Sequence, residues 1–263
     1  MEREYWQRQD AQKPLFPDMA WSRPENRMQA GKLLVAGGNL HGFAAPAEAY
    51  TEAVKAGIGT ARVLLPNAIQ KIVGRVLENG EFAPSTPSGS FSQKALEEFL
   101  FSAHWADAVL LAGDLGRNSE TAILLEKFLH KYSQAVTLTK DAVDYAVSAP
   151  QTVLQREHTA LVLSFSQLQR LGTAAKVATP IAFSMDLLRL VEWLHEFTLT
   201  HQPYIVVKHL DTMLVAVRGR VSTTRLTDEL PIWRIATSAH IAVWWLQNPA
   251  KPFEALTAAL ATK

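Results

Sequence analysis

The chain has 263 residues, of which 48% are hydrophobic and 19% are charged, a composition typical of a globular protein with a sizeable core. Its 26 Lys and Arg residues nearly balance its 25 Asp and Glu residues, so the sequence offers no basic field for nucleic acid or anionic lipid. Cysteine is absent, which excludes disulfides, thiolate catalysis and cysteine-ligated metal. We therefore expect neither a nucleic-acid nor a membrane partner.

The apolar runs and the polar start of the chain argue against a membrane or secreted location. Residues 1–12, MEREYWQRQDAQ, are too polar for a signal peptide. The longest apolar runs, such as Ile241 to Leu246, are too short to span a bilayer. The sequence therefore predicts a soluble, cytoplasmic protein.

The first thirty residues differ in character from the rest of the chain. They combine three prolines with aromatic residues such as Trp6 and Trp21. Prolines disrupt regular structure and aromatic side chains favour burial, so we predict an N-terminal arm over residues 1–30 that packs on the body. Residues 31–263 are expected to form a single domain, because they contain no internal repeat.

From residue 32 onwards, short apolar runs alternate with helical stretches. The run KLLVAGG, residues 32–38, predicts a buried strand that ends in a glycine turn. Further strands are predicted at 61–65, 108–112, 135–139 and 159–163. Helices are predicted at 44–56, 68–77, 95–104, 120–131, 141–147 and 166–171, with a loop at 79–90 rich in Gly, Pro and Ser.

The last third of the chain begins with a strong helical stripe over residues 185–197. Two strand-like runs at 204–207 and 212–217 lie close together, which predicts an antiparallel hairpin at the edge of the sheet. Helices at 233–246 and 253–261 complete the chain. Strands that alternate with helices indicate an α/β fold, with a mainly parallel sheet covered on both faces. Ligands of such sheets bind outside the carboxyl ends of the strands, where the glycine turns after Ala36 and Ala112 lie.

The segment LLVAGGNLHGFAAPAEAYTEAVKAGIGTARVLLP, residues 33–66, places glycines in a distinctive order. It is similar to the opening of the ATP- or ADP-dependent NAD(P)H-hydrate dehydratases, ribokinase-like enzymes that repair hydrated nicotinamide cofactors. Further similar segments follow in the family's order: DAVLLAGDLGR at 107–117, LTKDAV at 138–143, ALVLSFSQLQRLG at 160–172, IVVKHLDTMLV at 205–215 and PFEAL at 252–256. The resemblance covers residues 30–263 and implies a ribokinase-like three-layer αβα sandwich with a C-terminal edge hairpin.

The same resemblance implies a ligand site. It would bind a nucleotide or dinucleotide partner: ATP or ADP with Mg²⁺, and an NAD(P)H-type ligand. No residue is singled out as a metal ligand. The family's Gly-x-Gly-Asp turn, which opens a helix and carries the general-base aspartate, corresponds to residues 237–240, so His240 would stand in the catalytic position. The implied cofactor-binding residues are Gly37, Gly38, Gly42, Gly113, Asp114, Gly116, Lys208, Thr237, Ser238 and Ala239.

Several of these positions depart from the family's pattern. Both glycines of the Gly-x-Gly-Asp turn have gained side chains, and a β-carbon limits the backbone conformations that a phosphate-binding turn uses. The aspartate has become His240, whose type of side chain can act as a base. Asp114 replaces the second glycine of a Gly-Pro-Gly-Leu-Gly turn and places a carboxylate beside a site for anions. His209 replaces the glycine that follows the family's lysine, here Lys208.

Two hypotheses follow. The first is a pseudo-enzyme that keeps at most nucleotide or nicotinamide-cofactor binding, or an assembly role. The alternative is an active, divergent NAD(P)H-hydrate dehydratase or related small-molecule kinase that uses His240 as its base. For single residues, interpretations without a ligand also stay open: the glycine turns can serve only to reverse the chain, and Lys208 can be a solvent-exposed lysine. Trp244 and Trp245 suit either a core or the interface of a homo-oligomer.

Overall fold

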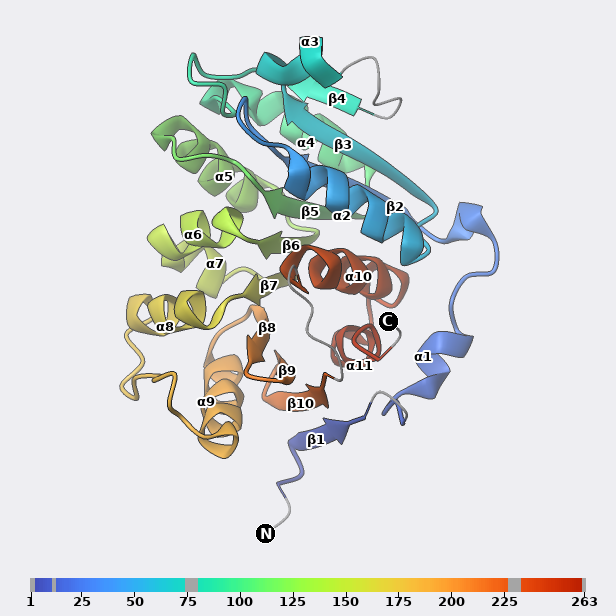
Figure 1. The fold of residues 1–263 in the computed structure, drawn as a ribbon, viewed down its shortest axis with the longest axis vertical. Helices are drawn as coiled ribbons and strands as arrows, with labels where there is room; N and C mark the ends of the chain where they lie inside the picture. The colour runs from blue at the N-terminus through green and yellow to red at the C-terminus, as the bar shows by residue number, and fades with distance from the viewer. Residues whose placement is uncertain (1–2, 11–12, 74–79, 227–232, 262–263) are drawn as a thin grey trace.

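One sheet crosses the whole molecule. The computed structural model describes residues 3–10, 13–73, 80–226 and 233–261. Within these residues, ten strands follow one another in the order β1-β10-β9-β8-β7-β6-β5-β2-β3-β4, from the bottom to the top of Figure 1. The strands are β1 (Trp6–Gln9), β2 (Lys32–Gly37), β3 (Thr60–Pro66), β4 (Gly80–Ala83), β5 (Ala108–Gly113), β6 (Ala135–Thr139), β7 (Thr159–Leu163), β8 (Tyr204–His209), β9 (Thr212–Val217) and β10 (Arg220–Arg225).

The pairing of the strands confirms the predicted fold class. All strands from β4 across to β8 run parallel, whereas β9 is antiparallel to β8, and β10 to β9. Every residue of β5, AVLLAG, is buried, as expected for a parallel strand that is covered on both faces. The predicted hairpin is β8–β9, and β10 and β1 extend the sheet beyond it, with β1 parallel to β10.

Helices form a layer on each face of the sheet (Figure 1). Side chains alternate between the two faces along each strand, so Leu33 and Val35 of β2 contact one layer, and Leu34 and Ala36 contact the other. One layer contains α1 (Pro17–Trp21), α2 (Ala44–Lys55), α10 (Trp233–Gln247) and α11 (Pro252–Ala258). The other contains α4 (Leu96–Trp105), α5 (Ser119–Lys131), α6 (Asp141–Ser148), α7 (Pro150–Leu154), α8 (Phe165–Ala174) and α9 (Leu187–Thr200).

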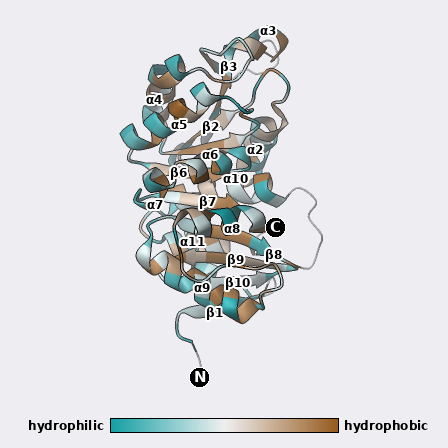
Figure 2. Ribbon diagram, turned by 90° about the vertical axis from the view of Figure 1, so that its left-hand side faces the viewer, coloured by the Kyte–Doolittle hydropathy of each residue, from teal (hydrophilic) through white to brown (hydrophobic). Residues whose placement is uncertain are grey.

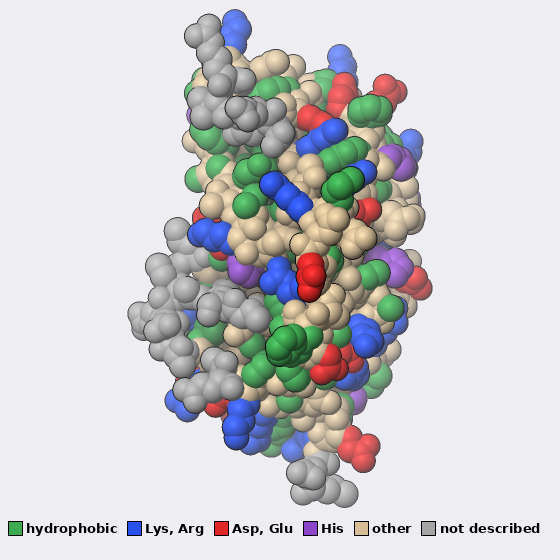
Figure 3. Space-filling view, turned by 90° about the vertical axis from the view of Figure 1, so that its right-hand side faces the viewer, with side chains coloured by type: hydrophobic (Ala, Val, Ile, Leu, Met, Phe, Trp, Pro, Cys, Tyr) green, Lys and Arg blue, Asp and Glu red, His purple; other side chains and the backbone are tan. Residues whose placement is uncertain are grey.

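The distribution of polarity follows from these layers. Figure 2 shows mainly hydrophobic residues on central strands such as β6 and β9, and hydrophilic residues on the outer parts of the helices. On the face drawn in Figure 3, Lys and Arg side chains are interspersed with Asp and Glu, in keeping with the balanced charge. Among the described helices, none is both long and apolar enough to span a bilayer.

Some elements differ from the sequence predictions. β1 lies within the segment predicted to be irregular, and it is possible there because it ends before the first proline, Pro14. β4 lies in the predicted loop 79–90. The predicted helix 68–77 is a 3₁₀ turn (Asn67–Ile69) followed by the short α3 (Gln70–Val73), and its second half lies outside the described residues. Two further 3₁₀ turns cover Arg27–Gln29 and Gln93–Ala95.

Candidate functional site at the carboxyl ends of the strands

The glycine turns that follow β2 and β5 pack directly on each other. Gly38 donates its backbone N–H to the carbonyl oxygen of Gly113 over 2.9 Å. A β-carbon on Gly37 would lie 2.5 Å from that same oxygen, so only glycine fits there. Gly113 itself has a φ of 97°, which side chains rarely adopt. The structure therefore brings together the two glycine turns that the sequence singled out.

Asp114 fills the space between these turns with an ion pair and a helix cap. One carboxylate oxygen, Oδ1, lies 2.6 Å from Nζ of Lys140, at the end of β6. The other, Oδ2, accepts the backbone N–H of Ala45 over 2.8 Å, in the first turn of α2. The first N–H groups of a helix lack helical partners and attract anions. An internal carboxylate thus takes the position that an external anion would otherwise bind.

The backbone around this ion pair adopts conformations unusual for residues with side chains. Asp114 has a φ of 55° and Lys140 a φ of 52°, both in the left-handed region. Asn39, in the turn after β2, donates its side-chain amide to the carbonyl of Asp114 over 2.6 Å. Strained residues often gather at functional sites, where the surrounding structure holds them in place. Here the two residues with positive φ, Asp114 and Lys140, are also the two that form the ion pair.

Two more carboxyl groups lie close to this pair. Asp141 accepts the backbone N–H of Leu115 over 2.9 Å through Oδ2, while its buried Oδ1 has no hydrogen-bond partner among the described residues. Burial raises the pKa of Asp141, and the Asp114 carboxylate adds to the rise. Burial also raises the pKa of Glu48 on α2, helped by Glu52. These acidic groups disfavour the approach of a further anion.

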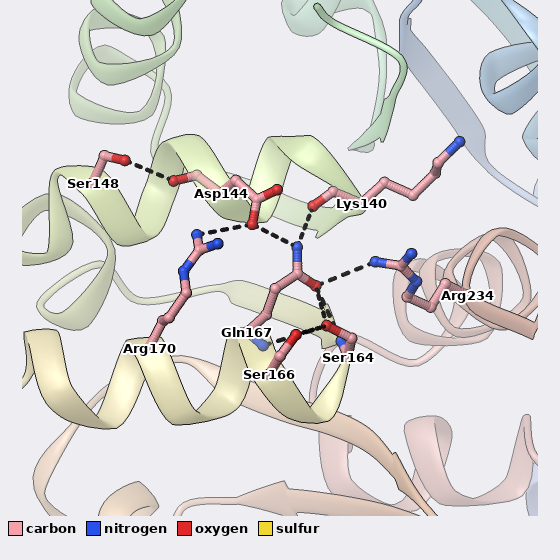
Figure 4. Close-up of polar contacts among 8 residues, drawn as sticks. All are labelled: Lys140, Asp144, Ser148, Ser164, Ser166, Gln167, Arg170 and Arg234. Carbon is pink, nitrogen blue, oxygen red and sulfur yellow. Dashed lines mark hydrogen bonds and ion pairs between the residues drawn. The ribbon is translucent and has the colours of Figure 1, made fainter. Parts of the chain in front are cut away.

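A second cluster, centred on Gln167, lies at the neighbouring strand ends (Figure 4). Ser164 caps α8 and exchanges hydrogen bonds with Gln167 in a capping box. The Gln167 amide nitrogen donates to the Lys140 carbonyl over 2.7 Å and to Asp144 Oδ1 over 2.8 Å. Its oxygen accepts from Arg234, at the start of α10, over 3.3 Å. Gln167 therefore links β6, α6, α8 and α10 and is committed to internal contacts.

Lys208 and His209 lie at the end of β8, away from the glycine turns. The strand order puts three strand spacings between β5 and β8, about 14 Å at about 4.8 Å each. His209 is buried against the rings of Phe165 and Phe183, and its Nε2 lies 3.2 Å from the Met185 carbonyl. The structure therefore does not bring Lys208 together with Gly37 and Gly113.

The predicted helix 233–246 is confirmed by α10 (Trp233–Gln247). Residues 237–240, which the resemblance aligned with a turn that opens a helix, therefore lie in the second turn of α10. Only the first four N–H groups of a helix are free to bind a ligand, and from Thr237 onwards each N–H can pair with a helical carbonyl. Thr237, Ser238 and Ala239 are also fully buried. They form no cradle for phosphate in this structure.

His240 lies in the same helix and packs against α2. Its Nε2 is 3.3 Å from Oε2 of Glu52, and both side chains are largely buried. Burial of Glu52 opposes ionisation, but contacts with Lys55 and His240 hold the pKa of Glu52 below its ordinary value. The resemblance placed His240 at the end of a turn that opens a helix; in the structure it lies within α10 and contacts Glu52 of α2.

Sequence reasoning missed Lys140, Gln167 and Arg234. Lys140 stands within LTKDAV, where the motif comparison drew attention to the aspartates, and Gln167 resembles an ordinary helix residue. A Ser followed three residues later by Gln is a capping-box signal, and this could have identified Ser164 and Gln167 as a pair. Among the described residues, no group of three or more His, Asp or Glu is arranged to hold a metal ion.

Comparisons with known proteins agree on the fold. No protein-family model matches the sequence. The bifunctional NAD(P)H-hydrate repair enzyme of Moorella thermoacetica is 29% identical over 155 residues, which are 56% of this chain and 29% of that enzyme. A ribokinase-like superfamily protein from Enterococcus faecalis superposes with a TM-score of 0.72 at 12% identity, over 99% of this chain and 87% of the other.

The ADP/ATP-dependent NAD(P)H-hydrate dehydratase of Bacillus subtilis, co-crystallised with ATP and Mg²⁺, superposes with a TM-score of 0.61 at 15% identity. The alignment covers 94% of this chain and 86% of that enzyme. At this identity the likeness establishes the fold alone. The chain therefore has the ribokinase-like fold, and part of its sequence is similar to that of an NAD(P)H-hydrate repair enzyme.

Proposed function

We propose that this chain is a catalytically inactive relative of the NAD(P)H-hydrate dehydratases. Under this proposal it retains at most the binding of a nucleotide or nicotinamide-type ligand, or a role in assembly. The observation that supports it most strongly is the position of Asp114, whose carboxylate satisfies both Lys140 and the N-terminus of α2. In this chain the positive groups at the glycine turns are already neutralised.

The charged groups at the glycine turns weigh against phosphoryl transfer there. Phosphoryl transfer requires positive groups that stabilise the charge on the transferred phosphate. Lys140 is engaged by Asp114, and Asp141 and Glu48 add acidic groups nearby. A phosphate without a metal ion would therefore meet like charges at these turns.

The position of residues 237–240 also supports the proposal. The mechanism implied by the resemblance needs free backbone N–H groups and a base at the start of a helix. In this chain the aligned residues lie in the second turn of α10, and Thr237, Ser238 and Ala239 are buried in the core. Neither requirement is met at these residues.

The alternative is an active, divergent dehydratase or small-molecule kinase with His240 as its base. The contact between His240 Nε2 and Glu52 favours it, because a carboxylate beside an imidazole is a common way to orient a catalytic histidine. Against it stands the burial of the pair between two helices, since a base must reach the proton it removes. We therefore keep it as the second candidate.

The deciding experiment measures turnover and binding on the same purified chain. Dehydration of hydrated NADH and NADPH would be followed with ATP or ADP and Mg²⁺, with the Bacillus subtilis dehydratase as positive control. We expect no turnover above that of a mock purification. Turnover that His240→Ala abolishes would overturn the proposal and establish the alternative.

Calorimetric titration with ATP, ADP, NADH and NADPH then separates the two forms of the proposal. Saturable binding without turnover would indicate a ligand-binding protein. If none of the four binds, an assembly role in the cytoplasm becomes the better account, and sedimentation analysis should then show a homo-oligomer.

A further inference from the structure

The sheet ends at β1, which pairs with another strand on one side only. β1 runs parallel to β10, with Trp6 opposite Val221 and Arg8 opposite Thr223. In the described part of the chain no strand lies beyond β1, and Figure 1 shows it at the lower end of the sheet. An edge strand presents a row of backbone N–H and C=O groups to which a further strand can bind.

The register determines which backbone groups of β1 face outwards. Val221 donates its N–H to the Tyr5 carbonyl over 2.7 Å. In a parallel pair, alternate residues of a strand direct their backbone groups to the same neighbour, so the odd-numbered residues of β1 bond to β10. The N–H and C=O groups of Trp6 and Arg8 therefore point away from the sheet.

Most of these outward groups are unused. The Trp6 N–H donates to the Arg3 carbonyl over 2.9 Å, in the turn before the strand. The Trp6 carbonyl and both backbone groups of Arg8 have no hydrogen-bond partner among the described residues. Arg8 is exposed and Trp6 is half-buried. The outer edge of β1 thus offers a free donor on Arg8 and a free acceptor on each of the two residues.

β1 is held firmly, so this edge is formed before a partner binds. The Tyr5 ring stacks on His195 of α9, with centroids 3.7 Å apart, and the Gln9 amide donates to the Thr257 carbonyl of α11 over 2.8 Å. Because α9 and α11 belong to opposite layers, these contacts hold the strand by its two faces and not by its edge. An edge that needs no reordering loses less free energy when it binds.

The edge carries little of the protection that edge strands usually have. Proline and outward-projecting charges commonly keep such strands apart. β1 has the sequence WQRQ, without proline, and the guanidinium of Arg8 lies 4.3 Å from the centroid of the Trp6 ring. The charge of the strand thus lies over an aromatic face, a contact that two chains can also make with each other.

We propose that two copies of this chain associate through β1, in an antiparallel pair about a two-fold axis at Gln7. The Arg8 N–H of each copy would donate to the Trp6 carbonyl of the other, and each Arg8 side chain would lie opposite a Trp6 ring. A two-fold interface uses the same patch twice, and the free groups of β1 are complementary to themselves in this way. The pairing would join two ten-stranded sheets into one. It goes beyond the proposed function, because it does not depend on whether the glycine turns bind a ligand.

The interface is short, so we expect a weak dimer with a dissociation constant of about 10–100 µM. Sedimentation equilibrium of the full chain, from roughly tenfold below to tenfold above this range, measures it. Monomers should predominate at the lowest concentration and dimers at the highest. The proposal fails if the chain remains monomeric throughout, and that result would leave the turnover and ligand-binding measurements unaffected.

Two substitutions at one position separate backbone pairing from side-chain effects. Arg8→Pro removes the N–H that crosses the interface and should raise the dissociation constant about a hundredfold, while proline is tolerated where an N–H faces away from the sheet. Arg8→Ala, the control, keeps this N–H and should raise the dissociation constant only about fivefold, through loss of the cation–π contact. Equal affinity of Arg8→Pro and the wild type, or equal losses in both variants, would contradict pairing through β1.

Amide hydrogen exchange tests the pairing without any substitution. In the wild type, the Arg8 amide should exchange about tenfold more slowly at the highest concentration than at the lowest, because only the dimer gives it an acceptor. The amide of Leu110, inside β5, is the control and should exchange equally slowly at both concentrations. If exchange of the Arg8 amide does not depend on concentration, the copies associate elsewhere or not at all, and the proposal is wrong.

Discussion

The two ends of the parallel strands carry similar kinds of polar group but satisfy them differently. At the carboxyl ends, the carboxylate of Asp114 meets Lys140 and the N-terminus of α2, and Gln167 links four elements. At the amino ends, the Arg156 guanidinium donates to five carbonyl oxygens, while the buried hydroxyl of Tyr132 has no hydrogen-bond partner among the described residues. Each end also keeps a buried polar atom without a hydrogen-bond partner among the described residues, Asp141 Oδ1 at the carboxyl ends and the Tyr132 hydroxyl at the amino ends, so the two ends differ in where their charged groups are engaged.

The difference shows that a fold does not by itself fix the state of its site. The sheet order is that of a ribokinase-like fold, whereas Asp114 and Lys140 contact each other at the ends of its strands. The contrast rests on specific contacts at each end, so substitutions can test each half of it.

The largest effect is expected for Arg156→Ala, at the amino end. Removing the guanidinium leaves several buried carbonyl oxygens without donors, so the free energy of unfolding should fall by about 3 kcal/mol or more. Urea denaturation measures this. The matched control is Arg170→Ala, whose half-exposed ion pair with Asp144 should contribute only about 0.5 kcal/mol. Similar losses in the free energy of unfolding for both variants would mean that the hydrogen bonds of Arg156 do not stabilise the fold more than an exposed ion pair does.

Gly37→Ala tests whether the carboxyl-end turns are tightly packed. The new β-carbon would lie 2.5 Å from the Gly113 carbonyl oxygen, and we expect a loss of about 2–3 kcal/mol in the free energy of unfolding. Gly42→Ala is the control, because its β-carbon would meet nothing closer than an Asp114 oxygen at 4.0 Å, and it should change stability by less than about 0.5 kcal/mol. Thermal and urea unfolding would show whether the two variants differ in this order.

Asp114→Gly should allow an external anion to bind at Lys140 and the first turn of α2. Lys140 and the first turn of α2 would lose their internal anion, so affinity for inorganic phosphate should rise about tenfold or more at low salt. Stability should fall by only about 1 kcal/mol, since glycine tolerates the positive φ. Phosphate titration would be compared with Asp211→Asn, which removes one carboxylate from the exposed turn after β8. Unchanged phosphate affinity in Asp114→Gly would show that the Asp114 carboxylate does not occupy an anion-binding position.

The smallest effect concerns the pH dependence contributed by Asp141. Its pKa is raised in the folded state, so its contribution favours folding at low pH and is lost as pH rises from its ordinary value of 3.8 through the raised value. Asp141→Asn should remove this dependence, so that the variant gains stability relative to the wild type over that window, by about 1 kcal/mol at most. If the free energies of unfolding of Asp141→Asn and the wild type, measured between pH 3 and 7, differ by a constant amount, the pKa of Asp141 is not raised.

Most of the fold could be predicted because its signals are local. Buried parallel strands such as β5 and β7 are continuous apolar runs, and α9 has a clear apolar stripe. β1 and β10 could not be predicted in this way. Their sequences, WQRQ and RVSTTR, lack an apolar alternation, and their pairing depends on residues more than 200 positions apart. No local pattern encodes such a contact.

The candidate site could be predicted from the sequence only where the backbone conformation requires one residue type. Gly37 and Gly113 could be placed because tight turns at strand ends demand glycine. The Lys140–Asp114 pair could not, because it depends on how the ends of β5 and β6 meet in space. The apolar pattern predicted the helix over 233–246 correctly, whereas the resemblance aligned residues 237–240 with a turn, because a motif comparison fixes residue order but not where a helix begins.

The parallel pairing of β1 with β10 has a consequence for how the chain reaches this structure. β1 is made long before its partner β10, which follows β9. Bringing them together closes a loop of roughly 200 residues, a type of contact that slows folding. During synthesis, this edge of the sheet can therefore form only after β10 has been made, and the fluorescence of Trp6, which donates to Thr223, would report its formation.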